Sequence, residues 1–444
     1  LTEAYVVPAA GGEPLMWSEG LSSAGAVAWS PDSSSLLVIG SDVPGYLGLW
    51  QSWLYVLQEG KPPRQLTDDL YRPYLGFPGI TPPPELRWQT NNRILYLGER
   101  RGESFLLELP AEGGNPQSII SGGLISGFCL DYVGETGVLL RSTAESPADL
   151  YRVELKSHTD IQLTSHNLEY LEGHPAARME KFCIDREGTE IECRLFLPPG
   201  FDANGKYPLV LDIHGGPNGA FYDSFVAWQQ VLATDGYLVL AVNPRGSSTY
   251  GNDFMMAVLG DWGGDDYLDL MAAVDAVSDR PYVDAGRIGI HGYSYGGYMT
   301  SWAIGHTDRF KAAVIGAPCI DLHSMYGTSD IGISFGELQW ECSVEEAQVH
   351  GVAGMENLSS KLLQRSPITY AHQVQSPVLL LHGEADARCP ISQSEAYFTM
   401  LKRLNKEVEF VRFPDCSHLF PRLGHPKMRE EYLARTLVWF QRYV

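Results

Sequence analysis

The sequence predicts an α/β domain over residues 171–444, preceded by short antiparallel strands over residues 1–170. Two observations carry this prediction. Beyond residue 200, apolar runs with the length of buried strands alternate with segments whose apolar residues recur at helical spacing, which is typical of a mostly parallel sheet covered on both faces. Before residue 170, strand-like segments recur at nearly regular intervals, which is typical of a repeat architecture.

The strands expected in the α/β domain are short and apolar. They lie at residues 207–213, 238–242, 288–290, 312–315, 377–381 and 408–413. Between them, residues 266–277 predict a helix with one buried face, and residues 429–442 predict the closing helix. We expect Asp265, Asp266 and Asp269 to form a solvated first turn of the earlier helix, where the helix dipole favours acidic side chains.

A Gly-x-Ser-x-Gly motif stands at residues 292–296, between an apolar run and a helix-compatible stretch. This strand–turn–helix context is that of a nucleophile elbow in an α/β-hydrolase. Ser294 must sit on a sharp turn, and Gly292 and Gly296 leave room where a Cβ would collide with a neighbouring strand or helix. The serine also lies at the N-terminus of a helix, whose free N–H groups favour developing negative charge. We therefore expect Ser294 to be a nucleophile rather than part of an ordinary turn.

A serine nucleophile needs a base and an orienting carboxylate, and in this fold the acid and then the base follow the serine along the chain. Asp386 follows a buried-strand run and is the candidate acid, with Glu384 as the alternative. His418 follows the next strand and is the candidate base, with His425 as the alternative. We expect Asp415 to be a turn residue.

The strand at 207–213 is followed at once by His214-Gly215-Gly216-Pro217. Glycines at this point let backbone N–H groups approach a scissile carbonyl, as in the Gly-rich loop of esterases. The same logic makes the N–H of Tyr295, the residue after the nucleophile, a second donor. The alternative is an ordinary strand-to-helix turn.

Residues 178–444 resemble the catalytic domain of the prolyl oligopeptidase family of serine peptidases, closest to its acylaminoacyl-peptidase branch. The resemblance rests on motifs at residues 214–217, 243–247, 250–251, 292–298, 324–330, 366–367, 383–388 and 417–418. It implies five site residues, which are the catalytic triad Ser294, Asp386 and His418 and the backbone oxyanion donors Gly216 and Tyr295. Two residues depart from the family's pattern without touching the chemistry directly: Cys389 stands where Thr or Val is more usual, and Pro244 replaces an aromatic or aliphatic residue.

The same resemblance implies contacts with the substrate. Arg388 would reach into the cleft and bond a substrate carbonyl, and the alternative is a surface salt bridge. Segment 318–340 lies where the family builds its first side-chain pocket. Its apolar residues are Met325, Tyr326, Ile331, Phe335 and Trp340, of which the first four are the candidates for lining the pocket; the alternative is that they pack the segment onto the domain core. An apolar pocket predicts preference for a hydrophobic or aromatic residue on the acyl side of the cut. Arg245, in a Gly/Ser turn, is expected to be structural.

Before residue 170 the strand-like segments fall into repeated units, which run over residues 27–67, 86–109 and 128–164. The 40-residue step from Trp88 to Phe128 is the length of a four-stranded propeller blade. Residues 4–15 resemble the closing strands of one more blade. The sequence therefore predicts a partial β-propeller of about three and a half blades.

A closed propeller usually has four to eight blades, and the family has about seven. We therefore expect a preceding stretch of polypeptide to supply the missing N-terminal part of the propeller in the native molecule. A naturally shortened propeller is the alternative.

Composition argues against several function classes. The net charge of −22 argues against nucleic-acid binding, which requires basic patches. No apolar run reaches the ~20 residues of a membrane helix. The seven cysteines are scattered without C-x-x-C spacing, which favours reduced thiols in a cytoplasmic protein. The twelve histidines show no paired-ligand spacing, so we expect no metal site and no cofactor.

These observations predict a serine peptidase that cleaves short peptides through an acyl-enzyme, of the acylaminoacyl-peptidase or aminopeptidase/oligopeptidase type. Membrane and nucleic-acid partners are not expected, and homo-oligomerisation is left open. One alternative is a carboxylesterase or amide hydrolase of small metabolites with the same triad, because one fold and triad serve both chemistries. Another is a non-catalytic propeller scaffold, against which the complete triad argues.

Overall fold

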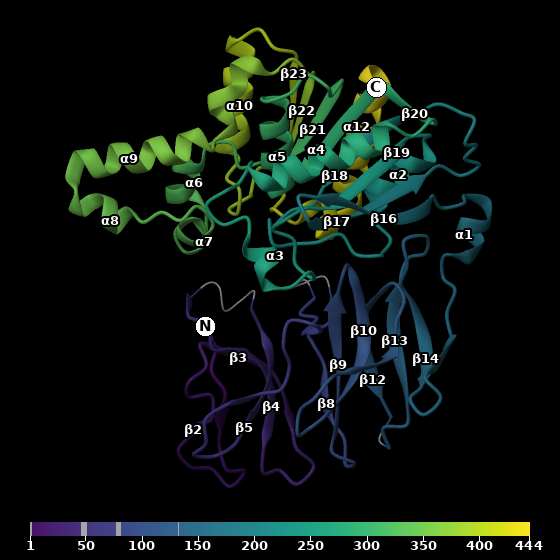
Figure 1. The fold of residues 1–444 in the computed structure, drawn as a ribbon, viewed down its shortest axis with the longest axis vertical. Coiled ribbons are helices and arrows are strands. Elements are labelled where there is room, and N and C mark those ends of the chain that lie inside the picture. Colours follow the sequence, from purple (N-terminus) through teal and green to yellow (C-terminus); the bar gives the residue numbers. More distant parts are fainter. Residues whose placement is uncertain (1, 46–50, 77–80, 132) are drawn as a thin grey trace. The chain divides into compact units, whose positions relative to one another are not determined.

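The computed structural model describes residues 2–45, 51–76, 81–131 and 133–444 (Figure 1). Contacts within the chain divide it into two compact units. The N-terminal unit comprises the residues up to His174 together with Tyr222–Phe225 and Thr249–Asn252, and the C-terminal unit comprises the remainder.

The N-terminal unit is built from antiparallel sheets that follow one another along the chain. The first pairs β1 (Tyr5–Val6) with β2 (Leu15–Met16). The second has the order β3 (Ser23–Trp29), β4 (Leu36–Ser41), β5 (Trp53–Leu57) and β6 (Arg64–Gln65). The third joins β7 (Arg72–Pro73), β8 (Leu86–Trp88), β9 (Arg93–Arg100), β10 (Glu103–Pro110) and β11 (Gln117–Ile120). The fourth has the order β12 (Leu124–Leu130), β13 (Thr136–Ser142), β14 (Asp149–Glu154) and β15 (Thr159–Gln162), and α1 (Leu168–Gly173) follows it.

Apolar side chains fill the spaces between successive sheets of this unit. One cluster joins the second and third sheets through residues such as Leu37, Leu54 and Tyr96. Another joins the third and fourth through residues such as Leu106 and Phe128. Among the described residues the sheets form an open series that does not close into a ring.

The C-terminal unit contains one eight-stranded sheet. Its strands, in spatial order, are β16 (Arg178–Arg186), β17 (Thr189–Leu197), β19 (Leu238–Asn243), β18 (Tyr207–Ile213), β20 (Val283–Tyr293), β21 (Ala312–Gly316), β22 (Val378–Gly383) and β23 (Val408–Phe413). The β16–β17 and β17–β19 pairs are antiparallel, and all later pairs are parallel. The parallel strands β18 to β22 are largely apolar runs because both faces of the sheet are covered by helices, whereas the edge strand β23 has exposed Glu409 and Arg412. All the strands predicted in this region are present.

Helices pack on both faces of this sheet (Figure 1). α12 (Pro426–Tyr443) and α2 (Ala227–Thr234) contact each other on one face. α5 (Tyr295–Ile304) lies on the other face, as the alternation along β20 shows. A Cβ at Gly289 would meet Phe440 of α12 at 2.6 Å, whereas one at Gly292 would meet the backbone of α5 at 2.2 Å. The two glycines therefore let helices approach β20 closely from opposite sides.

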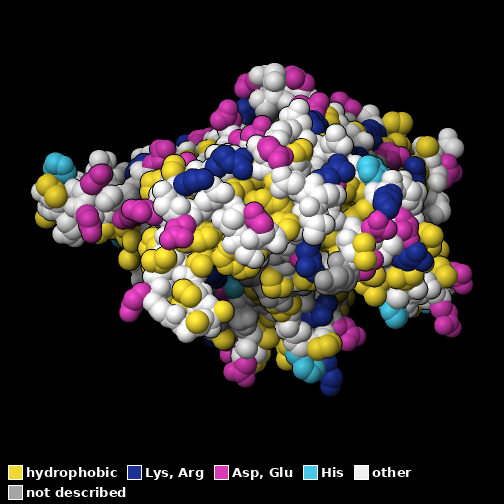
Figure 2. Space-filling view, turned by 90° about the horizontal axis from the view of Figure 1, so that it is seen from below, with side chains coloured by type: hydrophobic (Ala, Val, Ile, Leu, Met, Phe, Trp, Pro, Cys, Tyr) yellow, Lys and Arg dark blue, Asp and Glu magenta, His cyan; other side chains and the backbone are white. Residues whose placement is uncertain are grey.

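The remaining helices lie in the connections between strands. They are α3 (Asn252–Met256), α4 (Asp265–Ser278), α6 (Leu322–Thr328), α7 (Gly332–Gln339), α8 (Val344–Val349), α9 (Gly351–Gln364), the 3₁₀ turn η2 (Pro367–Gln373), α10 (Ser392–Arg403) and α11 (Phe420–Leu423). The predicted helices correspond to α4 and α12, each extended by a few residues. On the face drawn in Figure 2, Lys and Arg side chains are interspersed with acidic and apolar ones and do not gather into one broad basic patch.

Candidate active site

Ser294 stands on a sharp turn between β20 and α5. Its backbone angles are φ 64° and ψ −121°, in a left-handed region that residues with a Cβ rarely adopt. The flanking glycines are required by space: a Cβ on Gly292 would lie 2.2 Å from the carbonyl oxygen of Gly296, and one on Gly296 would lie 2.2 Å from that of Ile213. The turn therefore places the serine hydroxyl beyond the strand end, where it is free to meet other loops.

Ser294, His418 and Asp386 form a continuous chain of hydrogen bonds. The Oγ of Ser294 lies 3.0 Å from Nε2 of His418, and Nδ1 of His418 lies 2.7 Å from Oδ2 of Asp386. The carboxylate of Asp386 is buried, and the His418 side chain is 13% exposed. A proton on the hydroxyl can therefore pass to the imidazole while the carboxylate holds the ring orientation.

The environment of Asp386 keeps its carboxylate charged. Its Oδ1 accepts the N–H groups of Arg388 and Cys389, each at 2.9 Å. Burial works to raise the pKa of Asp386, but hydrogen bonds from His382 and His418 outweigh it and lower the pKa to about 2. An ionised acid at this point is what an imidazolium at His418 requires.

The alternative acid and base lie elsewhere. Glu384 forms an ion pair with Arg412 at 2.7 Å. His425 caps α12, where its Nδ1 accepts the N–H of Lys427 at 3.2 Å. Asp415 is exposed and has φ 55°, as expected of a turn residue. The structure thus brings Asp386 and His418 together with Ser294, whereas Glu384 and His425 have other partners.

The His214–Pro217 loop lies beside the nucleophile. A Cβ on Gly215 would lie 3.4 Å from Cβ of Ser294. Gly216 has φ 133°, and a Cβ there would lie 2.4 Å from the backbone nitrogen of Gly219. The N–H groups of Gly216 and Tyr295 have no hydrogen-bond acceptor among the described residues, and the latter belongs to the first turn of α5, where N–H groups are normally free. Both can therefore donate to an oxyanion.

Buried polar groups hold this loop. His214 bonds the carbonyl oxygen of Gly215 through Nδ1 at 2.8 Å and Oγ of Ser247 through Nε2 at 2.9 Å. Burial lowers the pKa of His214 to about 4, so the ring is neutral at pH 7. The amide of Asn218 donates to two backbone carbonyl oxygens and accepts from Gln339 at 2.7 Å. The glycine backbone is therefore fixed before any substrate arrives.

A scan against family models matches residues 223–444, half of the chain, to the prolyl oligopeptidase family of peptidases. The chain belongs to the prolyl oligopeptidase family. This confirms the resemblance and, with it, the predicted α/β-hydrolase fold of the C-terminal unit.

Curated relatives of the family support this assignment. The chain is 36% identical over 360 residues to the uncharacterized peptidase YuxL of Bacillus subtilis (strain 168), covering 80% of this chain and 53% of that protein. It is 30% identical over 259 residues to the acylamino-acid-releasing enzyme of Sus scrofa, covering 58% of this chain and 34% of that protein. The chain thus spans about half, or less, of the length of these relatives.

Solved structures are similar over nearly the whole chain. The acylaminoacyl peptidase of Pyrococcus horikoshii superposes with a TM-score of 0.83 at 28% identity, covering 99% of this chain and 66% of that one. A second similar structure, also with a TM-score of 0.83, is an acylaminoacyl peptidase in complex with Z-Gly-Gly-Phe-chloromethyl ketone, covering 65% of that chain.

The pocket candidates from the family resemblance differ in their surroundings. Met325 and Phe335 are buried, whereas Tyr326 and Ile331 are half-buried. Phe335 packs against the Trp262 ring at a centroid distance of 5.9 Å, and the hydroxyl of Tyr326 donates to Glu337 at 2.6 Å. Met325 and Phe335 therefore pack the segment onto the domain.

Arg388 pairs with Asp330, and both side chains are exposed. The Nε of Arg388 lies 2.8 Å from Oδ1 of Asp330. The backbone joins the same segments, because the N–H of Asp330 donates to the carbonyl oxygen of Ala387 at 3.0 Å and Oγ of Ser329 donates to that of Arg388 at 2.6 Å. The segment with the pocket candidates is thereby tied to the acid loop.

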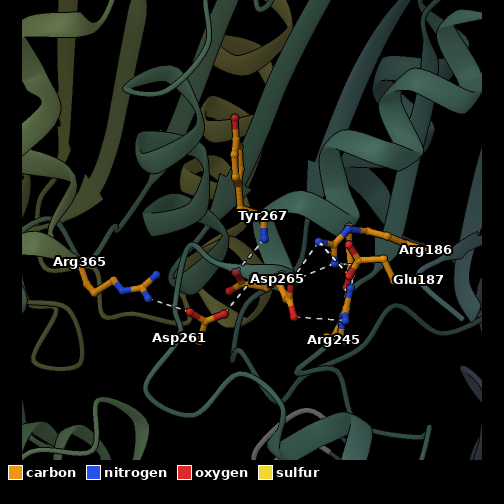
Figure 3. A network of polar contacts seen from close by, with 9 residues as sticks. Arg186, Glu187, Arg245, Asp261, Asp265, Tyr267 and Arg365 are labelled. Atoms are coloured by element: carbon orange, nitrogen blue, oxygen red, sulfur yellow. Dashed lines mark hydrogen bonds and ion pairs between the residues drawn. The ribbon is translucent and has the colours of Figure 1, made fainter. Parts of the chain in front are cut away.

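The aspartates of α4 correct one expectation. Asp266 and Asp269 are buried, so the prediction of a solvated first turn is wrong for both. Oxygens of Asp269 accept from Arg245 at 2.7 Å and Arg186 at 3.1 Å. Figure 3 shows the same two arginines converging on Asp265, which is half-exposed. Arg245 is thus structural, as predicted.

Asp266 lies beneath the oxyanion candidate Tyr295. The Tyr295 hydroxyl donates to its carboxylate, which also accepts the N–H groups of Tyr267 at 2.7 Å and Gly263 at 3.2 Å. Burial raises the pKa of Asp266 to about 7, even though these hydrogen bonds oppose the shift. The first turns of α4 and α5 are therefore joined under the elbow.

Two contributors to the site were missed by sequence reasoning. Trp262 is buried and contacts the rings of Tyr295, Tyr298 and Phe335 at 4.9, 5.0 and 5.9 Å. His382 lies 3.3 Å from Asp386 through Nε2. Its spacing of four residues before the acid was the available signal, whereas Trp262 had none in the sequence.

Two further findings bear on the remaining predictions. Among the described residues, no group of three or more His, Cys, Asp or Glu side chains is placed to hold a metal ion. Within the same ranges, no helix has the length and apolar character needed to cross a membrane.

Proposed function

We propose that this chain carries the active site of a serine peptidase of the acylaminoacyl-peptidase type. The observation that carries the proposal is the hydrogen-bonded chain from Oγ of Ser294 through His418 to Asp386, with contacts of 3.0 and 2.7 Å. Family membership and the acylamino-acid-releasing relatives support a peptidase.

The mechanism follows from this geometry. Ser294 attacks the scissile carbonyl while Nε2 of His418 takes its proton, and Asp386 stabilises the imidazolium that results. The N–H groups of Gly216 and Tyr295 donate to the oxyanion of the tetrahedral intermediate. His418 then gives the proton to the leaving amine, which departs and leaves an acyl-enzyme. Water, activated by the same imidazole, hydrolyses the acyl-enzyme and restores Ser294 without any cofactor.

The proposed substrate is a short peptide with a hydrophobic or aromatic residue on the acyl side of the cut. The similar acylaminoacyl peptidase bound to Z-Gly-Gly-Phe-chloromethyl ketone supports this, because its ligand ends in Phe. Half-buried Tyr326 and Ile331 are the proposed apolar wall on this side, and buried Met325 and Phe335 hold their segment in place. Arg388 would bond a substrate carbonyl from its exposed position beside Asp330.

The antiparallel sheets of the N-terminal unit are proposed to be blades of a partial β-propeller. Sheets of four or five strands with apolar clusters between them support this assignment. A preceding polypeptide stretch would supply the further blades.

Active-site labelling tests the proposal. A fluorophosphonate probe should label the wild-type chain, and Ser294→Ala should abolish both labelling and turnover, with a loss of about 10⁴-fold or more. Ser360→Ala, a change at an exposed serine on α9, is the matched control and should behave as wild type. Labelling that persists in Ser294→Ala would contradict the nucleophile assignment.

Substrate comparison tests the specificity. We expect kcat/KM on acyl-Phe and acyl-Leu p-nitroanilides to exceed that on Lys, Arg or Glu analogues, because a charged side chain in an apolar pocket would lose its hydration without compensation. Faster turnover of charged analogues would contradict the pocket. Turnover of simple esters without any turnover of peptides would favour a carboxylesterase instead.

A further inference from the structure

A tyrosine on the nucleophile strand holds the backbone of the candidate base. Tyr293, the last residue of β20, donates from Oη to the carbonyl oxygen of His418 at 2.8 Å. Its ring also lies against the imidazole, with centroids 5.3 Å apart. Two consecutive residues therefore contact His418: Tyr293 bonds its backbone carbonyl, and Ser294 bonds Nε2 of its ring.

Other anchors of the His418 loop lie at its ends. The loop leaves β23 at Phe413 and enters α11 at Phe420. The N–H of Ala385 donates to the carbonyl oxygen of Cys416 at 3.0 Å, which fixes the loop before His418. Among the described residues, Tyr293 supplies the hydrogen bond to the carbonyl of His418 itself. Tyr293 therefore fixes the backbone from which the imidazole projects.

Tyr293 is braced by a buried network. Tyr432 of α12 packs edge-on against it, with ring centroids 6.0 Å apart. The Oη of Tyr432 lies 3.1 Å from Nε2 of His291, whose Nδ1 lies 2.7 Å from Asp212. Gly316 provides the space, because a Cβ there would lie 2.2 Å from Cδ2 of Tyr293. The ring of Tyr293 is therefore held by Tyr432, which also packs against Phe413 and Phe420 at the two ends of the loop.

The Tyr293 hydroxyl also stays protonated and so remains a hydrogen-bond donor. Burial raises the pKa of Tyr293 well above its ordinary value, so the phenol keeps its proton at every pH at which the protein would work. The bond to the His418 carbonyl does not involve the imidazole and is unaffected when the ring gains or loses a proton.

We propose that Tyr293 is a positioning residue that keeps His418 at hydrogen-bonding distance from Ser294 throughout the reaction. In acyl transfer the imidazole must keep its place while it takes a proton from Oγ and delivers it to the leaving group. A tether to the backbone of His418 meets this need, because it acts in both protonation states. The inference rests on the proposed function.

Tyr293→Phe tests the proposal, since it removes Oη and keeps the ring. We expect kcat on the best p-nitroanilide to fall about tenfold, because a small misplacement of a catalytic group slows the chemical step. KM should stay within about twofold. Tyr397→Phe is the matched control, because Tyr397 is also buried and its Oη has no partner among the described residues. This control should leave kcat unchanged.

Proton NMR supplies a readout that a purely structural role would not move. The Nδ1 proton of His418, shared with Asp386, should give a low-field resonance in wild type and in Tyr397→Phe, and this resonance should shift or broaden in Tyr293→Phe. Circular dichroism establishes that each variant is folded. Unchanged kcat and an unchanged resonance in folded Tyr293→Phe would overturn the proposal.

Tyr432→Phe provides a second variant. It keeps the Oη of Tyr293 and loses the bond to His291, so kcat is expected to stay within about threefold of wild type. A loss equal to that of Tyr293→Phe would show that packing, and not the tether, sets the rate, and would overturn the proposal. If wild type shows neither labelling nor turnover, the proposed function fails, whereas the His418 resonance still tests the tether.

Discussion

Asp386 and Asp266 are buried carboxylates near the nucleophile elbow, one bonded to His418 and the other to Tyr295, and their pKa values move in opposite directions. Each accepts two backbone N–H groups. The pKa of Asp386 falls to about 2, whereas that of Asp266 rises to about 7. Backbone hydrogen bonds therefore do not explain the difference.

The side-chain neighbours explain it. Asp386 faces the imidazoles of His382 and His418, which donate to it and favour its charge. Asp266 faces a single side-chain donor, the hydroxyl of Tyr295. Burial then dominates at Asp266, because a charge removed from water is costly when its hydrogen bonds do not replace its hydration. The comparison separates the acid proposed to support catalysis from one that packs against α5.

The largest expected effect is on activity at Asp386. Asp386→Asn should lower kcat about 10³- to 10⁴-fold, because a neutral amide stabilises the wrong tautomer of His418. Asp266→Asn should lower kcat by no more than about tenfold, because its effect reaches the site only through Tyr295. Steady-state kinetics of both variants on one peptide substrate make the test. Equal losses would break the distinction between the two carboxylates.

A third buried carboxylate extends the comparison to stability. Asp269 is accompanied by Arg245 and Arg186. Arg245→Ala should lower the free energy of unfolding by about 1–3 kcal/mol, because Arg186 remains as a partner and burial, which raises the pKa of Asp269 to about 8, lets the carboxyl take up a proton. Urea unfolding followed by tryptophan fluorescence measures it. The double variant Arg245→Ala/Asp269→Ala should lose less stability than the sum of the losses of the two single variants. Strictly additive losses would argue against the pairing.

The pH dependence of stability sharpens the comparison further. The pKa of Asp266 is higher in the folded chain than in the unfolded chain, so the folded state binds this proton more tightly. This carboxyl therefore lowers the stability as pH rises from about 4 to about 7, by a few kcal/mol. In Asp266→Asn that loss should disappear. Asp386 acts in the opposite sense, because its contribution is complete above about pH 4 and is lost as pH falls toward 2.

The smallest effect is expected at the exposed pair. Arg388 and Asp330 are both in contact with solvent, so Asp330→Ala should change the free energy of unfolding by less than about 1 kcal/mol. Arg388→Ala should be equally mild for stability and should raise KM several-fold if Arg388 contacts the substrate carbonyl. Chemical unfolding and Michaelis–Menten kinetics on the same preparations separate the two roles. An unchanged KM would assign Arg388 to the ion pair alone.

Local sequence signals predicted most of the C-terminal sheet and the three residues of the hydrogen-bonded chain. The strands are continuous apolar runs, and Ser294 stands in a motif whose glycines are required by contacts of 2.2 Å. Asp386 follows one of these apolar runs, and His418 follows a strand in which apolar and charged residues alternate. Because the carboxyl ends of parallel strands meet at one edge of the sheet, order along the chain was enough to bring them together.

The burial of Asp266 and Asp269 could not be predicted in the same way. Acidic residues in the first turn of a helix are usually solvated, and that rule fails here because Arg186 and Arg245 come from distant segments. The aromatic packing around Trp262 likewise joins three segments that are far apart in sequence. Helices α6 and α7 were not foreseen, because the apolar residues of segment 318–340 had been assigned to a substrate pocket.

The backbone turn at Ser294 fixes the position of the side chain at this residue, whichever atom that side chain carries beyond Cβ. The left-handed backbone at this residue aims Cβ away from the strand, and the crowded flanking glycines hold the backbone there. A thiol carried on the same Cβ would be delivered opposite His418 by the main chain alone. The backbone of the elbow, and not the hydroxyl group, therefore sets where the side chain of residue 294 lies relative to His418.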